Sequence, residues 1–423
     1  MATFSNNARR LRRLPDKVRE RFYDWRAPRY SSGIKFHLWP WSFSDVEHLA
    51  ADSVSSDRTY KSLLEAELRQ NLKLSKGLGV ALVGSGRSAL RLGLIALRRL
   101  RPDRSKIVLP TYCCGSVYDA AVSAGLTPIF IDTTESLNSV AADYLKALDG
   151  ETLGVIVVNL FGRWMAEDDR QKIFETCRHK SMFVLEDNAQ CYRPYPEDSA
   201  TTRARADIEI HSFGFGKLGM ATAGGALVFD QAAHEIWEEL KSYHPGSGAL
   251  ALRRFRYFEA GFGTAEHLKS DPDTVSNTTE QYGAEEISEL DAALALQSLR
   301  DSEKILRRSI EIGRRYAEVI KKFPKVYRFH DSERNIFFRF PVILRDVEAT
   351  NAFWAHMALY KIELEGMYVP LHLRYPRNGQ PPCVVSEELY RYVFNVPNRV
   401  SLLPSEIDRI VGALADFGKR RSR

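Results

Sequence analysis

Lys217 lies in a segment whose composition suits a nucleophilic amine. It ends the sequence His211-Ser-Phe-Gly-Phe-Gly-Lys217, and Ala223-Gly-Gly225 follows before an apolar stretch. Small and apolar neighbours exclude water, which lowers the pKa of an amine and favours the neutral form that a Schiff base requires. A lysine exposed in a surface loop is the alternative interpretation of the same residues.

Three further residues could surround a flat, nitrogen-containing cofactor. Asp187 ends the apolar stretch 182–187, where a carboxylate needs a partner such as a protonated pyridine nitrogen. A helix N-cap is the alternative for Asp187. Gln190 could bond a ring hydroxyl or lie at the surface. Tyr112, in Leu109-Pro-Thr-Tyr-Cys-Cys114, could stack on the ring or belong to the core.

A phosphate site is suggested by Gly84-Ser-Gly-Arg-Ser-Ala-Leu90, which opens a predicted helix. Glycines allow close approach of the backbone, and the first N–H groups of a helix attract anions. Gly86, Arg87 and Ser88 would lie in the first turn. A plain strand-to-helix turn explains the same residues equally well.

The surrounding elements are expected to bring these residues to one edge of a sheet. Apolar stretches at 107–109, 128–132, 154–159, 182–187 and 225–229 predict buried parallel strands, with helices at 88–100 and 167–179 between them. Such alternation predicts a mainly parallel sheet with helices on both faces, which binds ligands beyond the carboxyl ends of its strands. Residues 242–280 are interpreted as loops.

In the C-terminal third, the alternation of strands and helices gives way to a different pattern. A helical pattern over 286–322 predicts one long helix, and a strand at 335–343 with helices at 349–360 and 404–417 predicts a smaller α+β lobe. We therefore place a basic arm at 1–33, a large cofactor-binding domain at 34–285, and the connecting helix with the small domain at 286–423.

Bulk properties exclude several classes of protein. The 423 residues are 44% apolar and 27% charged, as in ordinary globular proteins, and no apolar run is long enough to span a membrane. The net charge of +6 gathers in the first thirty residues, which we interpret as a solvated segment rather than a nucleic-acid or membrane arm. Five cysteines without metal-ligand spacing, and no secretory signal, favour a reducing cytoplasm and no metal.

The order of phosphate turn, aromatic residue, Asp187 and Lys217 resembles that of fold-type-I pyridoxal-phosphate enzymes, and the motifs resemble one family in particular. GSGRSAL is similar to the SGTxAL of the DegT/StrS aminotransferases, VLEDNAQCY to their EDAAQA, and SFGFGKLGMATAGGALV to their SFxxxKxxxxGEGGmv. VVNLFGRWMAED, ISELDAALALQSL and YVPLH also resemble family segments, so the likeness extends from about residue 34 to 417.

The resemblance implies a fold-type-I α/β domain with a mainly parallel sheet of the seven-stranded type, and a role for each candidate residue. Lys217 would hold pyridoxal 5'-phosphate as a Schiff base and move the proton. Asp187 would hold the pyridine nitrogen protonated, Tyr112 would stack on the ring, and Gln190 would touch its oxygen. The phosphate would be held by Gly86, Arg87, Ser88 and Ser212, and His372 is a substrate-side candidate or a packed histidine.

The implied reaction moves an amino group from Glu or Gln to a nucleotide-linked keto-sugar or a related cyclic ketone, in a cytoplasmic homodimer. A lyase, cyclase or condensing reaction on the same fold is the alternative, and a non-catalytic partner subunit is a third.

The alternative reactions are motivated by departures from the family pattern near the phosphate. Residues 284–287 read Ala-Glu-Glu-Ile where the family usually has Asn-Tyr-Arg-Met, whose Asn reaches the phosphate of the other subunit. The loop containing Asn277 could replace that contact, and Arg87, in place of a Thr, could add a positive one. The family's GEGG is Thr222-Ala-Gly-Gly225 here.

Overall fold

Among the residues that the structure describes, the larger of two sheets contains seven strands. In the computed structural model, which describes residues 33–34, 41, 43–55, 59–191, 205–230, 233–259, 284–330, 335–365, 368–375 and 379–422, the strand order is β1-β7-β6-β5-β4-β2-β3. The strands are β1 Gly79–Val83, β2 Lys106–Pro110, β3 Thr127–Ile131, β4 Thr152–Val158, β5 Phe183–Asp187, β6 Ile208–Ser212 and β7 Gly225–Phe229. Strands β3, β2, β4, β5 and β6 are parallel, whereas β7 is antiparallel to both β6 and β1.

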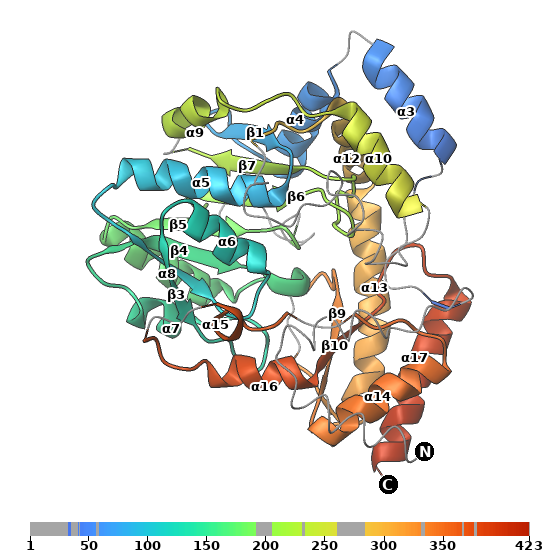
Figure 1. The fold of residues 1–423 in the computed structure, drawn as a ribbon. Helices are drawn as coiled ribbons and strands as arrows, with labels where there is room; N and C mark the ends of the chain where they lie inside the picture. The colour runs from blue at the N-terminus through green and yellow to red at the C-terminus, as the bar shows by residue number, and fades with distance from the viewer. Residues whose placement is uncertain are drawn as a thin grey trace.

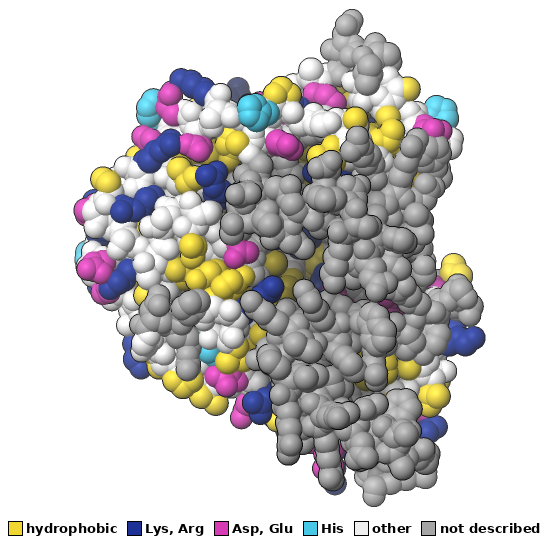
Figure 2. All heavy atoms as spheres, in the orientation of Figure 1, with side chains coloured by type: hydrophobic (Ala, Val, Ile, Leu, Met, Phe, Trp, Pro, Cys, Tyr) yellow, Lys and Arg dark blue, Asp and Glu magenta, His cyan; other side chains and the backbone are white. Residues whose placement is uncertain are grey.

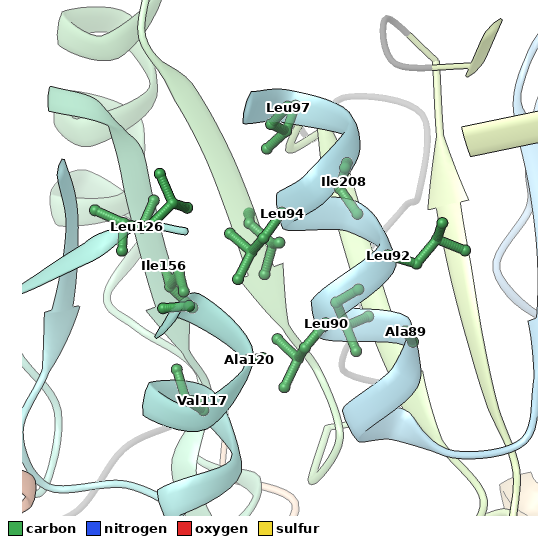
Figure 3. Packing of buried hydrophobic residues seen from close by; sticks show 14 of the residues in the cluster. Ala89, Leu90, Leu92, Leu94, Leu97, Val117, Ala120, Leu126, Ile156 and Ile208 are labelled. Atoms are coloured by element: carbon green, nitrogen blue, oxygen red, sulfur yellow. The ribbon is translucent and has the colours of Figure 1, made fainter. Parts of the chain in front are cut away.

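Helices cover both faces of this sheet, so the expected fold class is confirmed (Figure 1). One face packs on α5 Gly86–Leu100, α6 Gly115–Ser123 and α9 Ala233–Leu240. Figure 3 shows Leu90 and Leu94 of α5 pointing toward α6, where Val117 and Ala120 lie. The other face packs on α7 Ala141–Lys146 and α8 Glu167–His179, and beside β1 and β7 on α4 Tyr60–Asn71 and α12 Glu289–Arg300. Strands that are apolar on both faces can be buried only in such a layered arrangement.

A second sheet of three antiparallel strands follows in the C-terminal part. Its order is β10-β9-β8, with β8 Tyr327–Arg328, β9 Phe340–Leu344 and β10 Val393–Val396. It packs on α13 Ser302–Lys321, α14 Val347–Leu359 and α17 Pro404–Ser422. Between β9 and β10 in the chain, α14 is followed by α15 Leu371–Arg374 and α16 Val384–Tyr392.

Three expectations of secondary structure are corrected. The strand expected to be parallel at 225–229, β7, is antiparallel, because the residues between β6 and β7, all of them described, contain no crossover helix. The predicted helix over 286–322 is two helices, α12 and α13, which meet at Asp301. Asp301 has φ −90° and ψ 5°, and α12 is buried on nearly all sides whereas only one face of α13 is buried. The loops expected over 242–280 include α10 Gly248–Glu259, which contributes Ala251 and Phe255 to a core shared with α12. Residues 242–247 contain no helix, and residues 260–280 of that stretch lie outside the described residues.

The surface of the face in Figure 2 carries basic and acidic side chains interspersed over the part formed by α5, α6 and α9. Within the described ranges, no helix combines the length and apolar character needed to cross a bilayer. The basic arm expected over 1–33 falls outside the described residues, apart from Gly33.

Candidate active site

The predicted phosphate turn caps a helix. Ser85 has extended backbone angles, and its Oγ accepts the backbone N–H of Ser88 at 3.0 Å and lies 2.9 Å from the Ser88 Oγ. Because Ser85 is the N-cap, α5 begins at Gly86, and Arg87 and Ser88 occupy its first turn as the sequence predicts. The positive end of a fifteen-residue helix dipole therefore faces the end of the sheet.

Close packing at this turn requires glycine. A Cβ on Gly86 would lie 2.7 Å from the Cβ of Ser212 and 2.8 Å from its Oγ. A Cβ on Gly225 would lie 2.6 Å from the backbone nitrogen of Gly86. The turn after β1, the end of β6 and the start of β7 thus pack directly on one another in one glycine cradle. This cradle lies at the first N–H groups of α5, which suit an anion such as a phosphate.

Asp187 is the last residue of β5 and is buried. Burial raises the pKa of its carboxyl, while the backbone N–H of Ala189, 2.9 Å from Oδ1, and the charge of Lys217 lower it. A positively charged partner would stabilise the ionised form of this carboxylate, and the protonated nitrogen of a pyridine ring is such a partner.

Lys217 lies in the loop between β6 and β7. Gly216 has φ +74°, and the backbone N–H of Lys217 donates to the carbonyl of Gly214 at 3.1 Å, so a tight turn presents the side chain. Desolvation lowers the pKa of the amine, as does the charge of Arg339, while Cys114, Asp187 and Glu365 raise it. The net lowering is what the sequence predicts for a nucleophilic amine.

Tyr112 and Gln190 lie close to the same region. Tyr112 is buried in a cluster with Leu160 and Phe161, and its hydroxyl has no hydrogen-bond partner among the described residues. Burial raises its pKa. Gln190 accepts the backbone N–H of Phe161 at 2.7 Å and donates to the Tyr368 hydroxyl at 2.9 Å. A buried hydroxyl of this kind calls for a partner, and a bound cofactor is one.

His372 has the contacts of a packed histidine. Its Nδ1 lies 2.7 Å from the Oγ1 of Thr111, and its Nε2 lies 2.9 Å from a carboxylate oxygen of Glu387. The side chain is fully buried. These contacts fasten the segment after Tyr368 to the end of β2.

The C-terminal part also contributes residues that the sequence did not single out. The Lys217 Nζ lies 5.9 Å from the ring centroid of Phe338, and Arg339 and Glu365 act on the pKa of that amine. Tyr368 stacks on Phe161 with 6.0 Å between ring centroids and an interplanar angle of 6°. One signal was available, since Arg339 interrupts the apolar stretch 336–343 and a buried cation needs a partner.

Residues 284–287, which depart from the family pattern, make contacts with other residues of the same chain. The carbonyl of Glu285 accepts the N–H of Gly84 at 2.8 Å, and the carboxylate of Glu286 pairs with the Lys61 ammonium at 2.7 Å. Ile287 is buried. This segment therefore holds the end of β1 in place. Asn277 lies outside the described residues.

The residues fit pyridoxal 5'-phosphate. The helix N-terminus with its glycine cradle suits the phosphate, the buried Asp187 carboxylate suits the ring nitrogen, and the Lys217 amine of lowered pKa suits the carbonyl. The buried Tyr112 hydroxyl, which has no partner among the described residues, is consistent with a bound molecule beside it. Among the described residues, no three His, Cys, Asp or Glu side chains gather as they would around a metal ion. The fold and the site together define a fold-type-I pyridoxal-phosphate enzyme.

The family is established by comparison. The model of the DegT/DnrJ/EryC1/StrS aminotransferase family matches residues 45–415, so the chain belongs to this family. The protein is therefore a pyridoxal-phosphate-dependent aminotransferase. No curated protein matches the sequence.

Solved structures share the fold at low sequence identity. Helicobacter pylori PseC, an aminotransferase involved in the biosynthesis of pseudoaminic acid, is 15% identical with a TM-score of 0.72 over 92% of this chain and 100% of that one. The aminotransferase TlmJ of Streptoalloteichus hindustanus is 18% identical with a TM-score of 0.71, over 93% and 100%. DesV of S. venezuelae, solved with a ketimine intermediate, is 21% identical with a TM-score of 0.68, over 89% and 95%.

Proposed function

We propose that the protein transfers an amino group from glutamate or glutamine to the ketone of a nucleotide-linked sugar or a related cyclic compound, with Lys217 as the residue that binds the cofactor covalently. The observation that carries this proposal is the placement of Asp187 opposite Ile210 of β6, the strand that the Lys217 loop follows, so that the amine and the carboxylate lower and raise each other's pKa at one end of the sheet. An amine and a carboxylate in one partly desolvated site provide the nucleophile and the ring-nitrogen partner that this cofactor needs.

Each of the other residues predicted to bind the cofactor has a proposed role in holding it. The backbone of Gly86 and Arg87, with the hydroxyls of Ser88 and Ser212, would bind the phosphate in the cradle at the start of α5. Tyr112 would place its ring against the cofactor ring, and Gln190 would use its second amide hydrogen toward the ring oxygen. When bound, the cofactor supplies an electron sink for negative charge at the substrate carbon.

Lys217 would also carry the proton between the substrate carbon and the cofactor carbon. A lysine with an ordinary pKa near 10.5 stays protonated at neutral pH and is a poor base. Desolvation and the Arg339 charge lower the pKa of Lys217, which increases the fraction of neutral amine available to take up a proton. We also propose that the enzyme is a cytoplasmic homodimer.

The test compares Lys217→Ala with Lys241→Ala. Lys241 has 69% side-chain exposure and immediately follows α9. Both variants and the wild type are loaded with pyridoxal phosphate, reduced with borohydride and digested. The wild type and Lys241→Ala should carry the pyridoxyl group on the Lys217 peptide and absorb visible light before reduction, and Lys217→Ala should do neither. Covalent retention of the cofactor in Lys217→Ala would contradict the proposal.

The amino donor is tested on the same loaded protein. Glutamate or glutamine should remove the visible absorbance in a single turnover and yield the corresponding keto acid. A lyase, cyclase or condensing enzyme on the same fold would bind the cofactor equally well but would release no keto acid, so this measurement separates the two reactions.

A further inference from the structure

A single asparagine bonds the residues on both sides of Asp187. Asn159 follows β4, and its Nδ2 donates to the Oε1 of Glu186 at 3.1 Å and to the Oδ1 of Asn188 at 2.7 Å. The backbone N–H of Asn159 donates to the carbonyl of Asp187 at 3.2 Å. One residue therefore directs three N–H bonds at three consecutive residues, and the middle one is the proposed partner of the ring nitrogen.

These side-chain bonds hold the end of β5 from one face of the sheet. Side chains alternate along a strand, and in β5 Val184 packs with residues of α8 whereas Leu185 packs with residues of α5. Glu186 therefore points to the α8 side, where it meets Asn159, and Asp187 points to the opposite side. The amide of Asn159 can thus fix the direction of Asp187 without touching its carboxylate.

The orientation of the Asn159 amide is itself fixed. Its Oδ1 accepts the backbone N–H of Met165 at 3.1 Å, so its Nδ2 must face Glu186 and Asn188. The two carboxylate oxygens of Glu186 also accept from the Nε and Nη2 of Arg170, both at 3.1 Å. The side chains in this network are buried, and a buried polar network of this kind rigidifies the elements that it joins.

The neighbouring charges are paired as well. Glu209 of β6 lies opposite Glu186 in the sheet register, and both its oxygens accept from Arg205 at 3.0 Å. The charge of Glu186 raises the pKa of His211, but burial lowers that pKa to about 4, so His211 is neutral at neutral pH. Each of the two carboxylates on this side of the sheet therefore has its own guanidinium.

The loop that carries Asn159 is constrained at its next turn. Phe161 has φ 58° and ψ 19°, a conformation that a bulky residue rarely adopts. Its contacts maintain this conformation, because the backbone N–H donates to the Oε1 of Gln190 at 2.7 Å and the ring is buried beside Tyr112. Asn159 is therefore presented to β5 by a loop with little freedom to move.

We infer that Asn159 is a positioning residue, which aims the Asp187 carboxylate at the ring nitrogen by holding the residues before and after it. The inference rests on the proposed function, in which Asp187 is the partner of that nitrogen. A hydrogen bond between charged groups is strong only at a short distance and a good angle. A small rotation of the strand end would therefore weaken the contact and let the ring nitrogen lose its proton.

The experiment measures the pH midpoint of the visible absorbance of the protein loaded with pyridoxal phosphate. A protonated ring nitrogen is a positive charge close to the Schiff base and lowers the pKa of its nitrogen, so misplacement of Asp187 should raise the midpoint. Asn159→Ala should raise it by about one pH unit, a tenfold change in the protonation equilibrium, and Asn188→Ala should raise it less. Both variants exchange neutral side chains, so a change in net charge cannot cause the shift.

A double variant shows whether Asn159 acts through Asp187. Asp187→Asn should raise the midpoint at least as far as Asn159→Ala, and the two changes together should raise it no further than Asp187→Asn alone. The matched control is Asn398→Ala in the smaller lobe, because the Nδ2 of Asn398 also donates twice, to the carbonyls of Ser309 at 3.2 Å and Phe337 at 2.5 Å. This control should lower the melting temperature and leave the midpoint unchanged.

An unchanged midpoint in folded Asn159→Ala, beside a raised one in Asp187→Asn, overturns the inference and leaves a network that only stabilises the fold. A further rise in the double variant also overturns it, since Asn159 would then act by another route. If thermal melting shows that Asn159→Ala does not fold, Asn188→Ala decides alone by the same criterion. An unchanged midpoint in Asp187→Asn would instead contradict the role of Asp187 in the proposed function, so the two failures are distinguishable.

Discussion

Asp187 and Lys217 act on each other's pKa although thirty residues separate them in the chain. Asp187 pairs with Ile210 of β6 in the sheet register, and Lys217 follows β6 by a short glycine-rich loop. Burial drives each group toward its neutral form, while the charge of each favours ionisation of the other. The parallel pairing of β5 and β6 is therefore what brings the proposed nucleophile and the proposed ring partner to one edge.

The first prediction concerns this pair. Asp187→Asn should lower the transamination rate by about two orders of magnitude or more, because it removes a fixed charge from the reacting site. It should also lower the pKa of Lys217 further, since the carboxylate raises that pKa. The pH dependence of covalent cofactor loading of the apoprotein should then move to lower pH.

The control for this prediction is Asp149→Asn, because Asp149 is an exposed carboxylate paired with Lys106. It should change neither the rate nor the loading profile. A loading profile of Asp187→Asn that coincides with that of the wild type would show that the two groups are not coupled.

The second prediction concerns the cradle at the start of α5. Gly86→Ala would place a Cβ 2.7 Å from the Cβ of Ser212, so the turn or the end of β6 must shift. Overpacking of this kind costs about 1–3 kcal/mol, and we expect affinity for pyridoxal phosphate to fall about tenfold or more. Absorbance titration of the apoprotein measures this affinity.

Gly412→Ala is a matched control for Gly86→Ala. A Cβ on Gly412 would meet no atom within 4 Å, and the residue lies in α17. Alanine in a helix is more favourable than glycine by about 0.5–1 kcal/mol, so this variant should be slightly more stable with unchanged cofactor affinity. Equal cofactor affinity in both variants would mean that the cradle does not hold the phosphate.

The sequence predicted the cofactor side of the site because its signals are local. Asp187 ends a continuous apolar stretch, and Ser85 to Ser88 form a helix start within four residues, so each can be identified from its neighbours. Strands β1 and β6 were not singled out. Strand β6 alternates apolar and polar residues and contains Glu209 and His211, whose burial depends on partners elsewhere in the chain.

The substrate side could not be predicted in the same way. Arg339 interrupts an apolar stretch, but nothing in the sequence says which group it faces, and Glu365 alone is an ordinary charged residue. Both act on the pKa of Lys217 only through the packing of the smaller sheet. The break at Asp301 is equally non-local, since the helical pattern continues through it. Only the different layers on which α12 and α13 pack require the helix to end there.

The third prediction concerns a buried carboxylate that holds the turn after Lys217. The Oδ1 of Asp291 accepts the N–H of Thr222 and of Ala223, both at 3.1 Å, and the Thr222 hydroxyl at 2.5 Å. Asp291→Ala leaves these donors without an acceptor and should lower the free energy of unfolding by roughly 3 kcal/mol or more. Urea unfolding measures the change.

Asp301→Ala provides the comparison for Asp291→Ala, because Asp301 is exposed and its side chain caps no helix. Its effect on the free energy of unfolding should be small. If Asp291→Ala were as stable as Asp301→Ala, the contacts to residues 222 and 223 would contribute nothing to the fold.

The fourth prediction is a pH dependence of stability that comes from His211, a buried residue of β6. Burial lowers the pKa of His211 from 6.5 to about 4, as does the charge of Arg205, while Glu186 raises it. Because the unfolded chain takes up the proton first, the free energy of unfolding should fall as the pH is lowered from 6.5 toward 4, by up to about 3 kcal/mol. Above pH 6.5 both states carry neutral His211, and the contribution vanishes. His211→Gln should remove this dependence on pH, whereas His179→Gln, which changes an exposed histidine, should retain it. Urea unfolding at a series of pH values measures both. Identical slopes in the wild type and in His211→Gln would show that the fold does not hold His211 neutral.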